Sequence, residues 1–154
     1  QKEKVIHMPL NERELFARII KCEAAGEGDN GMKGVATVVM NRVHIPYGEY
    51  QRVCQGDLRC VIMQPRQFTC ILETIAGEYN AQNIYNMTPD QVHYDIADWA
   101  LSGNKSLAVD ESLWYYNPYS PECAAYFPVN QSGVYYNRIV QHCFYTPTRL
   151  YAQT

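Results

Sequence analysis

The spacing of the hydrophobic residues changes once along this chain of 154 residues, and that change constrains the fold more than any other feature. Up to about residue 103, apolar residues recur at helical spacing, as Leu15, Ile19 and Cys22 do. Beyond that point they form short runs rich in aromatic rings, such as residues 113–118, which is typical of strands. We therefore predict an α+β fold, helical in its N-terminal two-thirds and with a small β-rich C-terminal third.

Two helices are predicted near the N-terminus. The first covers residues 12–24, and Asn11 with Glu14 resembles a capping box at its start. The glycine-rich residues 26–31 interrupt the helical pattern. The second helix is expected at about residues 31–43, with its apolar residues on one buried face.

A third helix and three strands are predicted farther along the chain. The helix starts near Thr88, a candidate N-cap, and ends at Gly103. Residues 44–60, which precede it, contain proline and glycine punctuation and are predicted to form a loop. The predicted strands come last and cover residues 113–118, 134–136 and 139–145.

We predict a single domain over residues 1–154, because chains of roughly 100–200 residues usually form one domain. Residues 1–10 are polar and interpreted as a lead-in arm. No apolar run approaches the ~20 residues that a membrane span needs. The net charge of −3 and the pI of about 5.8 argue against nucleic acid as a partner, since nucleic-acid-binding domains usually carry a basic patch.

Tyrosine is unusually frequent, with 13 tyrosines against 4 phenylalanines. A tyrosine ring combines an apolar face with a polar tip, which suits a groove for a polar polymer. Charged residues make up only 19% of the chain, below the ~25% of typical domains. A neutral polymer such as a sugar chain would make little use of a strongly charged groove, so the two observations agree.

The six cysteines can form three disulfides, although the sequence alone does not fix their connectivity. Such bonds are typical of proteins that work outside the cytoplasm. No Cys-x-x-Cys or His-Glu-x-x-His motif occurs, so we predict neither a metal site nor a cofactor. The preferred pairs are Cys54–Cys60, Cys123–Cys143 and Cys22–Cys70.

The most informative segment is residues 22–27, and its central candidate is Glu23. Glu23 lies at the C-terminal end of the first predicted helix, where the helix macrodipole is negative. Partial burial and this dipole both disfavour the ionised carboxylate, so the pKa of Glu23 should rise. A carboxyl group that keeps its proton near neutral pH can act as a general acid on a glycosidic oxygen. The alternative is that Glu23 is an ordinary surface residue.

Glu27 is the second candidate catalytic residue. If the helix continued past Gly26, Glu23 and Glu27 would share one face. Two carboxyl groups are the usual requirement of a glycosidase. Because Gly26 is expected to end the helix, Glu27 is equally well explained as a residue that orients the loop.

Two segments that combine amides with aromatic rings are predicted to bind the substrate. Amides beside a ring suit sugar hydroxyl and N-acetyl groups, and alternation along a strand sends some rings to the core and others to a groove. The alternative is that the first segment is an ordinary loop and the second a core strand. The candidates are Gln64, Gln67, Phe68, Tyr115, Tyr116 and Asn117.

Taken together, these segments resemble the cell-wall hydrolase family of the spore cortex-lytic enzymes SleB and CwlJ. The resemblance covers about residues 13–147, and the end of the chain is closer to the CwlJ branch. Each segment alone is weak, but their order along the chain is specific. The segments are 23–27, Gly31 and 41–43 near the start, 64–68 in the middle, and 113–118 and 142–148 at the end.

The resemblance implies a small lysozyme-like domain that cleaves the glycan strand of peptidoglycan in the spore cortex, during germination or sporulation. It implies that Glu23 is the acid and base of a lytic transglycosylase acting between N-acetylmuramic acid and N-acetylglucosamine. The substrate would be cortex strands, with or without muramic-δ-lactam. The CwlJ-like ending implies a secreted or spore-associated location, with a spore coat protein as partner. At Ala25 the sequence departs from the family's common pattern.

Three other functions stay open at this stage. A glycan hydrolase, either a muramidase or a glucosaminidase, would use Glu27 to activate a water molecule. A cysteine-dependent peptidoglycan amidase or peptidase would pair a thiolate with His142, although the cysteines are better explained as bridges. A peptidoglycan-binding module without activity would keep the groove, but the presence of Glu23 argues against it.

Overall fold

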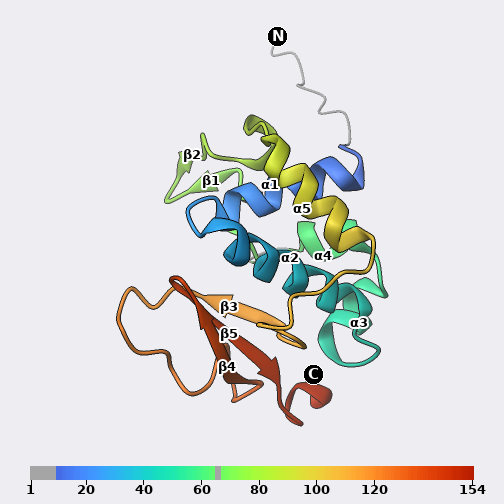
Figure 1. Cartoon of the computed structure of the whole chain (residues 1–154), viewed down its shortest axis with the longest axis vertical. Helices are drawn as coiled ribbons and strands as arrows, with labels where there is room; N and C mark the ends of the chain where they lie inside the picture. The colour runs from blue at the N-terminus through green and yellow to red at the C-terminus, as the bar shows by residue number, and fades with distance from the viewer. Residues whose placement is uncertain (1–9, 65–66) are drawn as a thin grey trace.

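Helices and a small sheet occupy separate parts of the molecule, as Figure 1 shows. The structure is a computed structural model that describes residues 10–64 and 67–154. The helical part lies above the three-stranded sheet in this view. This arrangement confirms the predicted α+β class. The single domain stays a prediction, and residues 1–9 of its lead-in arm lie outside the described residues.

α1 (Glu12–Ala24) and α2 (Gly28–His44) form the centre of the helical part. The side chain of Asn11 accepts a hydrogen bond of 2.8 Å from the backbone amide of Glu14, so the cap of α1 lies where the sequence predicts it. α2 begins a few residues earlier than predicted, because only a short turn over residues 25–27 separates the two helices.

Two short helices, α3 (Gly48–Cys54) and α4 (Leu58–Met63), occupy the segment around residues 44–60, so the prediction of a loop there is wrong. Gly48 and Gly56 have φ angles of 79° and 83° and mark the borders of these helices rather than an irregular loop. Each helix is too short for the spacing of its apolar residues to reveal it.

A small hairpin precedes the last α-helix. β1 (Thr74–Ile75) and β2 (Glu78–Tyr79) pair antiparallel, and strands this short leave no periodicity in the sequence. α5 (Gln91–Leu101) starts later than predicted. Its N-cap is Asp90, which forms a capping box with the first turn, rather than Thr88.

The sheet consists of β3 (Trp114–Tyr116), β4 (Gly133–Ile139) and β5 (His142–Pro147), in the antiparallel order β3-β5-β4. The first two strands agree with the prediction. The third predicted strand, residues 139–145, is wrong in its bounds because a tight turn interrupts it. Val140 in this turn has a φ angle of 53°, so the chain reverses there and β5 runs back beside β4.

Three disulfides connect these elements and use all six cysteines. One joins the end of α1 to the 3-10 helix η1 (Thr69–Ile71), one joins α3 to α4, and one joins the long loop before β4 to β5. Two further 3-10 helices are η2 (Ile84–Asn86) and η3 (Tyr151–Gln153). The bonded pairs are those preferred from the sequence: Cys22–Cys70, Cys54–Cys60 and Cys123–Cys143.

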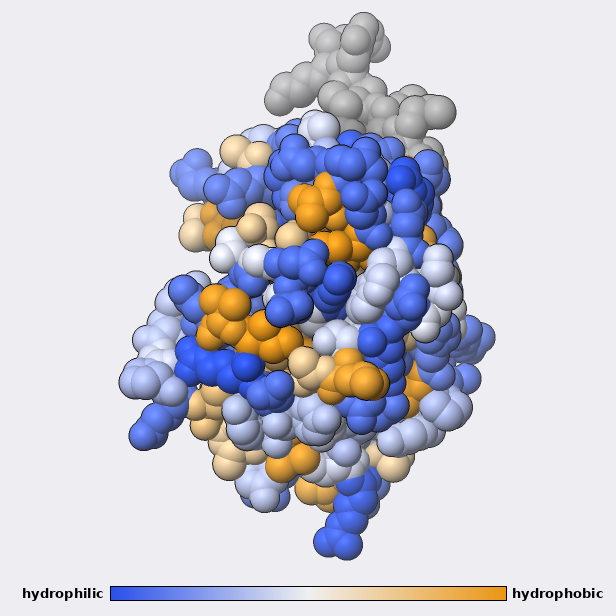
Figure 2. All heavy atoms as spheres, in the orientation of Figure 1, coloured by the Kyte–Doolittle hydropathy of each residue, from blue (hydrophilic) through white to orange (hydrophobic). Residues whose placement is uncertain are grey.

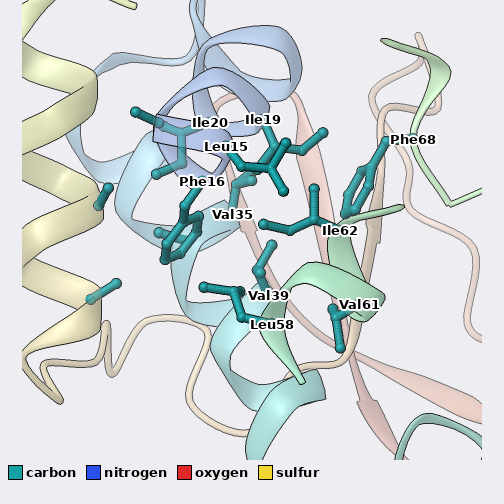
Figure 3. Close-up of a cluster of buried hydrophobic side chains, with 14 of the residues drawn as sticks. Leu15, Phe16, Ile19, Ile20, Val35, Val39, Leu58, Val61, Ile62 and Phe68 are labelled. Carbon is teal, nitrogen blue, oxygen red and sulfur yellow. The ribbon is translucent and has the colours of Figure 1, made fainter. Parts of the chain in front are cut away.

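The main hydrophobic core lies among α1, α2, α4 and α5, and Figure 3 shows part of it. Aliphatic and aromatic side chains from these helices point toward one another. Burying one such side chain stabilises the fold by about 1.5–3 kcal/mol. The residues labelled in Figure 3 are Leu15, Phe16, Ile19, Ile20, Val35, Val39, Leu58, Val61, Ile62 and Phe68.

α2 connects the helical core to the sheet. Val35 and Val39 belong to the helical core, whereas Val38 packs with Phe144 of β5. Gly34 allows this close approach, because a Cβ atom there would lie 3.0 Å from the Phe144 ring. The contact holds the sheet against the helices and places β3 opposite the end of α1.

On the face drawn in Figure 2, apolar residues form small separate patches among hydrophilic ones. Scattered apolar side chains of this kind are normal on protein surfaces. Over residues 10–64 and 67–154, none of the helices combines the length with the apolar character needed to cross a bilayer.

Candidate active site

Glu23 is the penultimate residue of α1, and its carboxyl group faces the sheet. The hydroxyl group of Tyr115 in β3 donates a hydrogen bond of 2.6 Å to Glu23 Oε1. On the other side, Sγ of Cys22 lies 3.8 Å from Glu23 Oε2, and this sulfur belongs to the disulfide with Cys70. The carboxyl group is therefore held between a phenol hydroxyl and a disulfide.

The electrostatic surroundings of Glu23 favour its protonated form. Burial raises the pKa of Glu23, and the hydrogen bond from Tyr115 and the positive charge of Arg42 oppose this rise without cancelling it. The direction agrees with the sequence analysis, where burial was one of the two expected causes. A partly buried carboxyl group of this kind can donate a proton and then be stabilised as an anion by two nearby groups.

Arg42 of α2 is the positive charge near Glu23, and it is only 4% exposed. Its Nε donates a hydrogen bond of 2.7 Å to the backbone carbonyl of Leu113, and its guanidinium lies over the rings of Tyr50 and Phe68. Arg42 is not among the site residues predicted from the sequence. The sequence signal was its helical spacing from the apolar residues of α2, which places Arg42 on the buried face of the helix. A charged side chain is rarely buried unless it has a partner, so this position indicates a specific role.

Tyr115 was predicted to bind substrate, and the structure gives its hydroxyl group a direct contact with Glu23. Burial raises the pKa of Tyr115 well above its ordinary value, and the charge of Glu23 adds to the rise. The phenol therefore stays neutral and keeps its proton for the hydrogen bond. Tyr115 can orient the carboxyl group and stabilise its anion.

Glu27 occupies the N-cap position of α2 and contacts the turn between β4 and β5. Its Oε2 accepts a hydrogen bond of 3.2 Å from the backbone amide of Gln141, and its Oε1 lies 3.7 Å from Nδ1 of His142. Burial lowers the pKa of His142, and the charge of Glu27 opposes this. Glu27 thus has a set of partners different from those of Glu23.

Two of the predicted substrate-binding residues in the central segment have other contacts. Phe68 is 2% exposed and belongs to the helical core of Figure 3, so the prediction that it contacts a sugar is wrong. Its ring fills space between helices and covers Arg42. Gln67 accepts a hydrogen bond of 3.0 Å from the Tyr50 hydroxyl, and Oε1 of Gln64 is buried without a partner among the described residues.

Tyr116 and Asn117 have contacts other than Glu23. Because side chains alternate along β3, Tyr116 points to the face opposite Tyr115 and stacks on Phe127 with ring centroids 4.5 Å apart. Tyr116 therefore does not line the cavity beside Glu23, and its contact with substrate stays a prediction. The amide of Asn117 donates a hydrogen bond of 2.7 Å to the side chain of Gln141, so it shapes the turn next to Glu27.

A cavity of about 470 Å³ opens beside Glu23, between the end of α1, η1 and the segment of the β1–β2 hairpin. Several amide side chains line it, and these residues were missed from the sequence. The available signal was the concentration of asparagine and glutamine over residues 80–86. The lining residues are Lys21, Cys22, Glu23, Ala25, Thr69, Cys70, Ile75, Asn80, Ala81, Gln82, Asn86 and Met87.

The cysteines next to Glu23 do not form a metal site or a nucleophile. Cys22, Glu23 and Cys70 have potential ligand atoms within 4.8 Å of one another. Both sulfur atoms are bonded in a disulfide, so neither is a thiolate that could bind a metal ion. Because all six cysteines are bonded, none can serve as a nucleophile, and the alternative of a cysteine-dependent amidase or peptidase is wrong.

A partly buried glutamate at a helix end faces a small antiparallel sheet beside a cavity, which agrees with a lysozyme-like domain. Over residues 26–145 the chain matches the protein family described as Cell Wall Hydrolase. The chain belongs to this family, and it is a peptidoglycan-cleaving enzyme. The matched range includes Glu27 and begins just after Glu23, so the case for Glu23 rests on its geometry.

Two curated relatives carry the same name. The chain is 31% identical over 135 residues to the cell wall hydrolase CwlJ of Bacillus subtilis (strain 168), which covers 88% of this chain and 84% of CwlJ. It is 26% identical over 144 residues to CwlJ of Halalkalibacterium halodurans, which covers 94% of this chain and 91% of that protein.

Two solved structures share the fold. The catalytic domain of the germination-specific lytic transglycosylase SleB from Bacillus anthracis has a TM-score of 0.62 and 21% identity, with 90% of this chain and 97% of that chain covered. The catalytic domain of Bacillus cereus SleB has a TM-score of 0.60 and 22% identity, with 88% and 89% covered. At these identities the likeness shows the lysozyme-like fold.

Proposed function

We propose that this enzyme is a lytic transglycosylase of peptidoglycan glycan strands, with Glu23 as both acid and base. The observation that carries the proposal is the hydrogen bond of 2.6 Å from Tyr115 to the partly buried carboxyl group of Glu23. Burial raises the pKa of that carboxyl group, which suits a general acid, and the cavity next to it gives a substrate access.

In the first step, the protonated Glu23 donates its proton to the oxygen between N-acetylmuramic acid and N-acetylglucosamine. The bond from this oxygen to the muramoyl anomeric carbon breaks, and the leaving sugar departs with a hydroxyl group. The resulting Glu23 carboxylate accepts the hydrogen bond from Tyr115 and is stabilised by the charge of Arg42. Both groups stabilise the anion that appears during the reaction.

In the second step, the Glu23 carboxylate takes the proton of the muramoyl C6 hydroxyl group. The C6 oxygen bonds to the anomeric carbon and closes a 1,6-anhydro ring. Glu23 ends protonated, as it began, and no water is consumed. One carboxyl group therefore suffices for both proton transfers.

The surroundings of Glu27 favour this reaction over hydrolysis. Hydrolysis by the usual glycosidase route needs a second carboxyl group that activates water or attacks the sugar. The Glu27 carboxylate is instead engaged by the backbone amide of Gln141 and faces His142. It contacts the sheet turn, so the role left to it is structural support of the site.

The amides of the cavity fit the proposed substrate. Asn80, Gln82 and Asn86 offer donors and acceptors for sugar hydroxyl and N-acetyl groups. We extend the proposal to spore cortex strands during germination, because the SleB relative is described as germination-specific. A location outside the cytoplasm agrees with three disulfides. A coat-protein partner and recognition of muramic-δ-lactam are further proposals that rest on the CwlJ-like ending.

The products of the reaction test this proposal. Purified spore cortex is digested with the enzyme, and the released muropeptides are analysed by mass spectrometry. We expect fragments that end in 1,6-anhydromuramic acid, which are lighter by one water than hydrolysis products. Fragments with reducing ends in their place would show a hydrolase. The Glu23→Gln variant serves as the blank for contaminating activity.

A further inference from the structure

A chain of contacts runs from the start of α2 to Glu23 through the sheet. Oε1 of Glu27 lies 3.7 Å from Nδ1 of His142. The His142 ring meets the Tyr115 ring edge-on, with centroids 5.0 Å apart. Tyr115 then donates its hydrogen bond to Glu23. The two glutamates are thus connected through an imidazole and a phenol ring.

The outer end of this chain of contacts is built into the fold. The side chains of His142 and Glu27 are only 11% and 12% exposed. A Cβ atom at Gly31 would collide with the Glu27 side chain, so the glycine leaves the space that this carboxylate occupies. Burying a carboxylate and an imidazole together costs desolvation free energy. Among the described residues, neither side chain forms a hydrogen bond with Glu23. Such a pair calls for an explanation beyond the closure of a turn.

The inner end depends on the orientation of one ring. The Tyr115 ring packs against both His142 and Phe144, with centroids 5.0 and 5.8 Å away, and these two rings also contact each other at 6.3 Å. Phe144 is fully buried in the sheet, and Nδ1 of His142 faces Oε1 of Glu27 at 3.7 Å, with no hydrogen-bond partner among the described residues. A small rotation of the phenol would lengthen its hydrogen bond to Glu23, and hydrogen bonds weaken steeply with distortion.

We infer that Glu27 and His142 are positioning residues, which hold Tyr115 so that its hydroxyl group keeps Glu23 in the reactive orientation. Glu27 does not act on the substrate. The inference rests on the proposed role of Glu23, but it concerns how the carboxyl group is held and not which bond is cleaved. Its test therefore uses variants of the supporting residues rather than the reaction products.

The test is a double-mutant cycle with Glu27→Gln and Tyr115→Phe. Glu27→Gln keeps the size of the side chain and an acceptor for the Gln141 amide, and it removes the charge that faces His142. We expect kcat to fall about threefold in Glu27→Gln and about tenfold in Tyr115→Phe, the size of one lost hydrogen bond to a charged group. KM should stay unchanged. The double variant should be no worse than Tyr115→Phe alone, because both changes remove the same support.

The pH profile supplies a readout that general loosening of the fold would not move. The groups that act on Glu23 are Tyr115 from β3 and Arg42 from α2. The hydrogen bond from Tyr115 lowers the pKa of Glu23, so its loss should raise that pKa. Because Glu23 must be protonated to act, the alkaline limb of kcat/KM should move to higher pH in Tyr115→Phe, and less far in Glu27→Gln.

Three results would overturn the inference: additive losses in the double variant, a wild-type rate and pH profile in Glu27→Gln, or a loss in Glu27→Gln as large as that in Glu23→Gln. The last would make Glu27 a reacting group. Glu111→Gln is the matched control, since it removes an exposed acid paired with Lys105 at 2.6 Å. Circular dichroism checks folding, and His142→Gln replaces Glu27→Gln in the cycle if the latter is unfolded. If Glu23→Gln proved fully active, the proposed function would fail separately.

Discussion

Glu23 and Glu27 are the same residue type on the two sides of one short turn, yet their surroundings differ in every respect. Glu23 lies at the C-terminal end of α1, where the helix dipole opposes a negative charge, and burial raises its pKa. Glu27 lies at the N-terminal end of α2, where the dipole favours a negative charge, and it faces an amide and an imidazole. This difference supports the proposal that Glu23 is the acid and Glu27 a supporting residue.

The difference teaches that sequence spacing does not assign roles to a pair of carboxyl groups. Tyr115 and His142, which distinguish the two glutamates, both come from the sheet. The predictions that follow are attempts to break this contrast, beginning with the one that should be largest.

The first prediction compares the activities of Glu23→Gln and Glu27→Gln. The glutamine at position 23 can still accept the Tyr115 hydrogen bond, but it has no proton to give. We expect the initial rate of cortex digestion to fall by about 10²–10⁴-fold, the usual contribution of a general acid. The loss in Glu27→Gln should be much smaller. Equal losses in the two variants, both folded by circular dichroism, would erase the contrast.

The second prediction concerns the Cys22–Cys70 disulfide, which lies next to Glu23 but not next to Glu27. Cys22–Cys70 closes a segment with a sequence separation of 48, against 6 for Cys54–Cys60. In the chain-entropy description, replacing each pair by alanine should cost about 4 and about 2 kcal/mol of unfolding free energy, respectively. The first replacement should also lower activity, because it frees the wall of the cavity next to Glu23.

Urea denaturation measures both costs, and activity is assayed in the absence of urea. The Cys54–Cys60 replacement is the matched control, because that pair joins α3 to α4 and lines no part of the cavity. An equal loss of activity in the two variants would mean that the disulfide next to Glu23 acts only through global stability.

Local signals account for what the sequence predicted correctly. The cap of α1 depends on Asn11 and Glu14, which are three residues apart, and the place of Glu23 at the end of an apolar helix already indicated its partial burial. The change from helical to extended spacing gives the α+β class. Each of these conclusions needs only a few consecutive residues.

Contacts between distant segments account for what the sequence missed. Tyr115 and Glu23 are 92 residues apart, and Gln141 and Glu27 are 114 apart, so no local pattern brings them together. The alternation along β3 predicts that Tyr115 and Tyr116 face opposite sides, but not which of them meets α1. The prediction that Phe68 binds substrate failed because its burial depends on the packing of distant helices, which its neighbours in the sequence do not show.

The third prediction, the smallest, compares the stabilities of the two glutamine variants across pH. Glu23→Gln should melt a few degrees higher than the unmodified protein at neutral and alkaline pH. Glu27→Gln should melt at a lower temperature than the unmodified protein, because it loses about 1 kcal/mol of unfolding free energy, a typical cost of disturbing a polar contact. Differential scanning calorimetry from pH 4 to pH 9 measures both.

The sign for Glu23 follows from proton linkage. Its pKa is higher in the folded chain than its ordinary value of 4.5, so the folded state binds the proton more tightly than the unfolded state does. Stability is therefore lost as the pH rises from the unfolded pKa through the folded one, and the glutamine variant escapes this loss. The advantage of Glu23→Gln should vanish in acid, where Glu23 is protonated in both states. A Glu23→Gln variant no more stable than the unmodified protein at pH 8 would mean that burial imposes no penalty on the Glu23 carboxylate, and the contrast with Glu27 would lose its electrostatic basis.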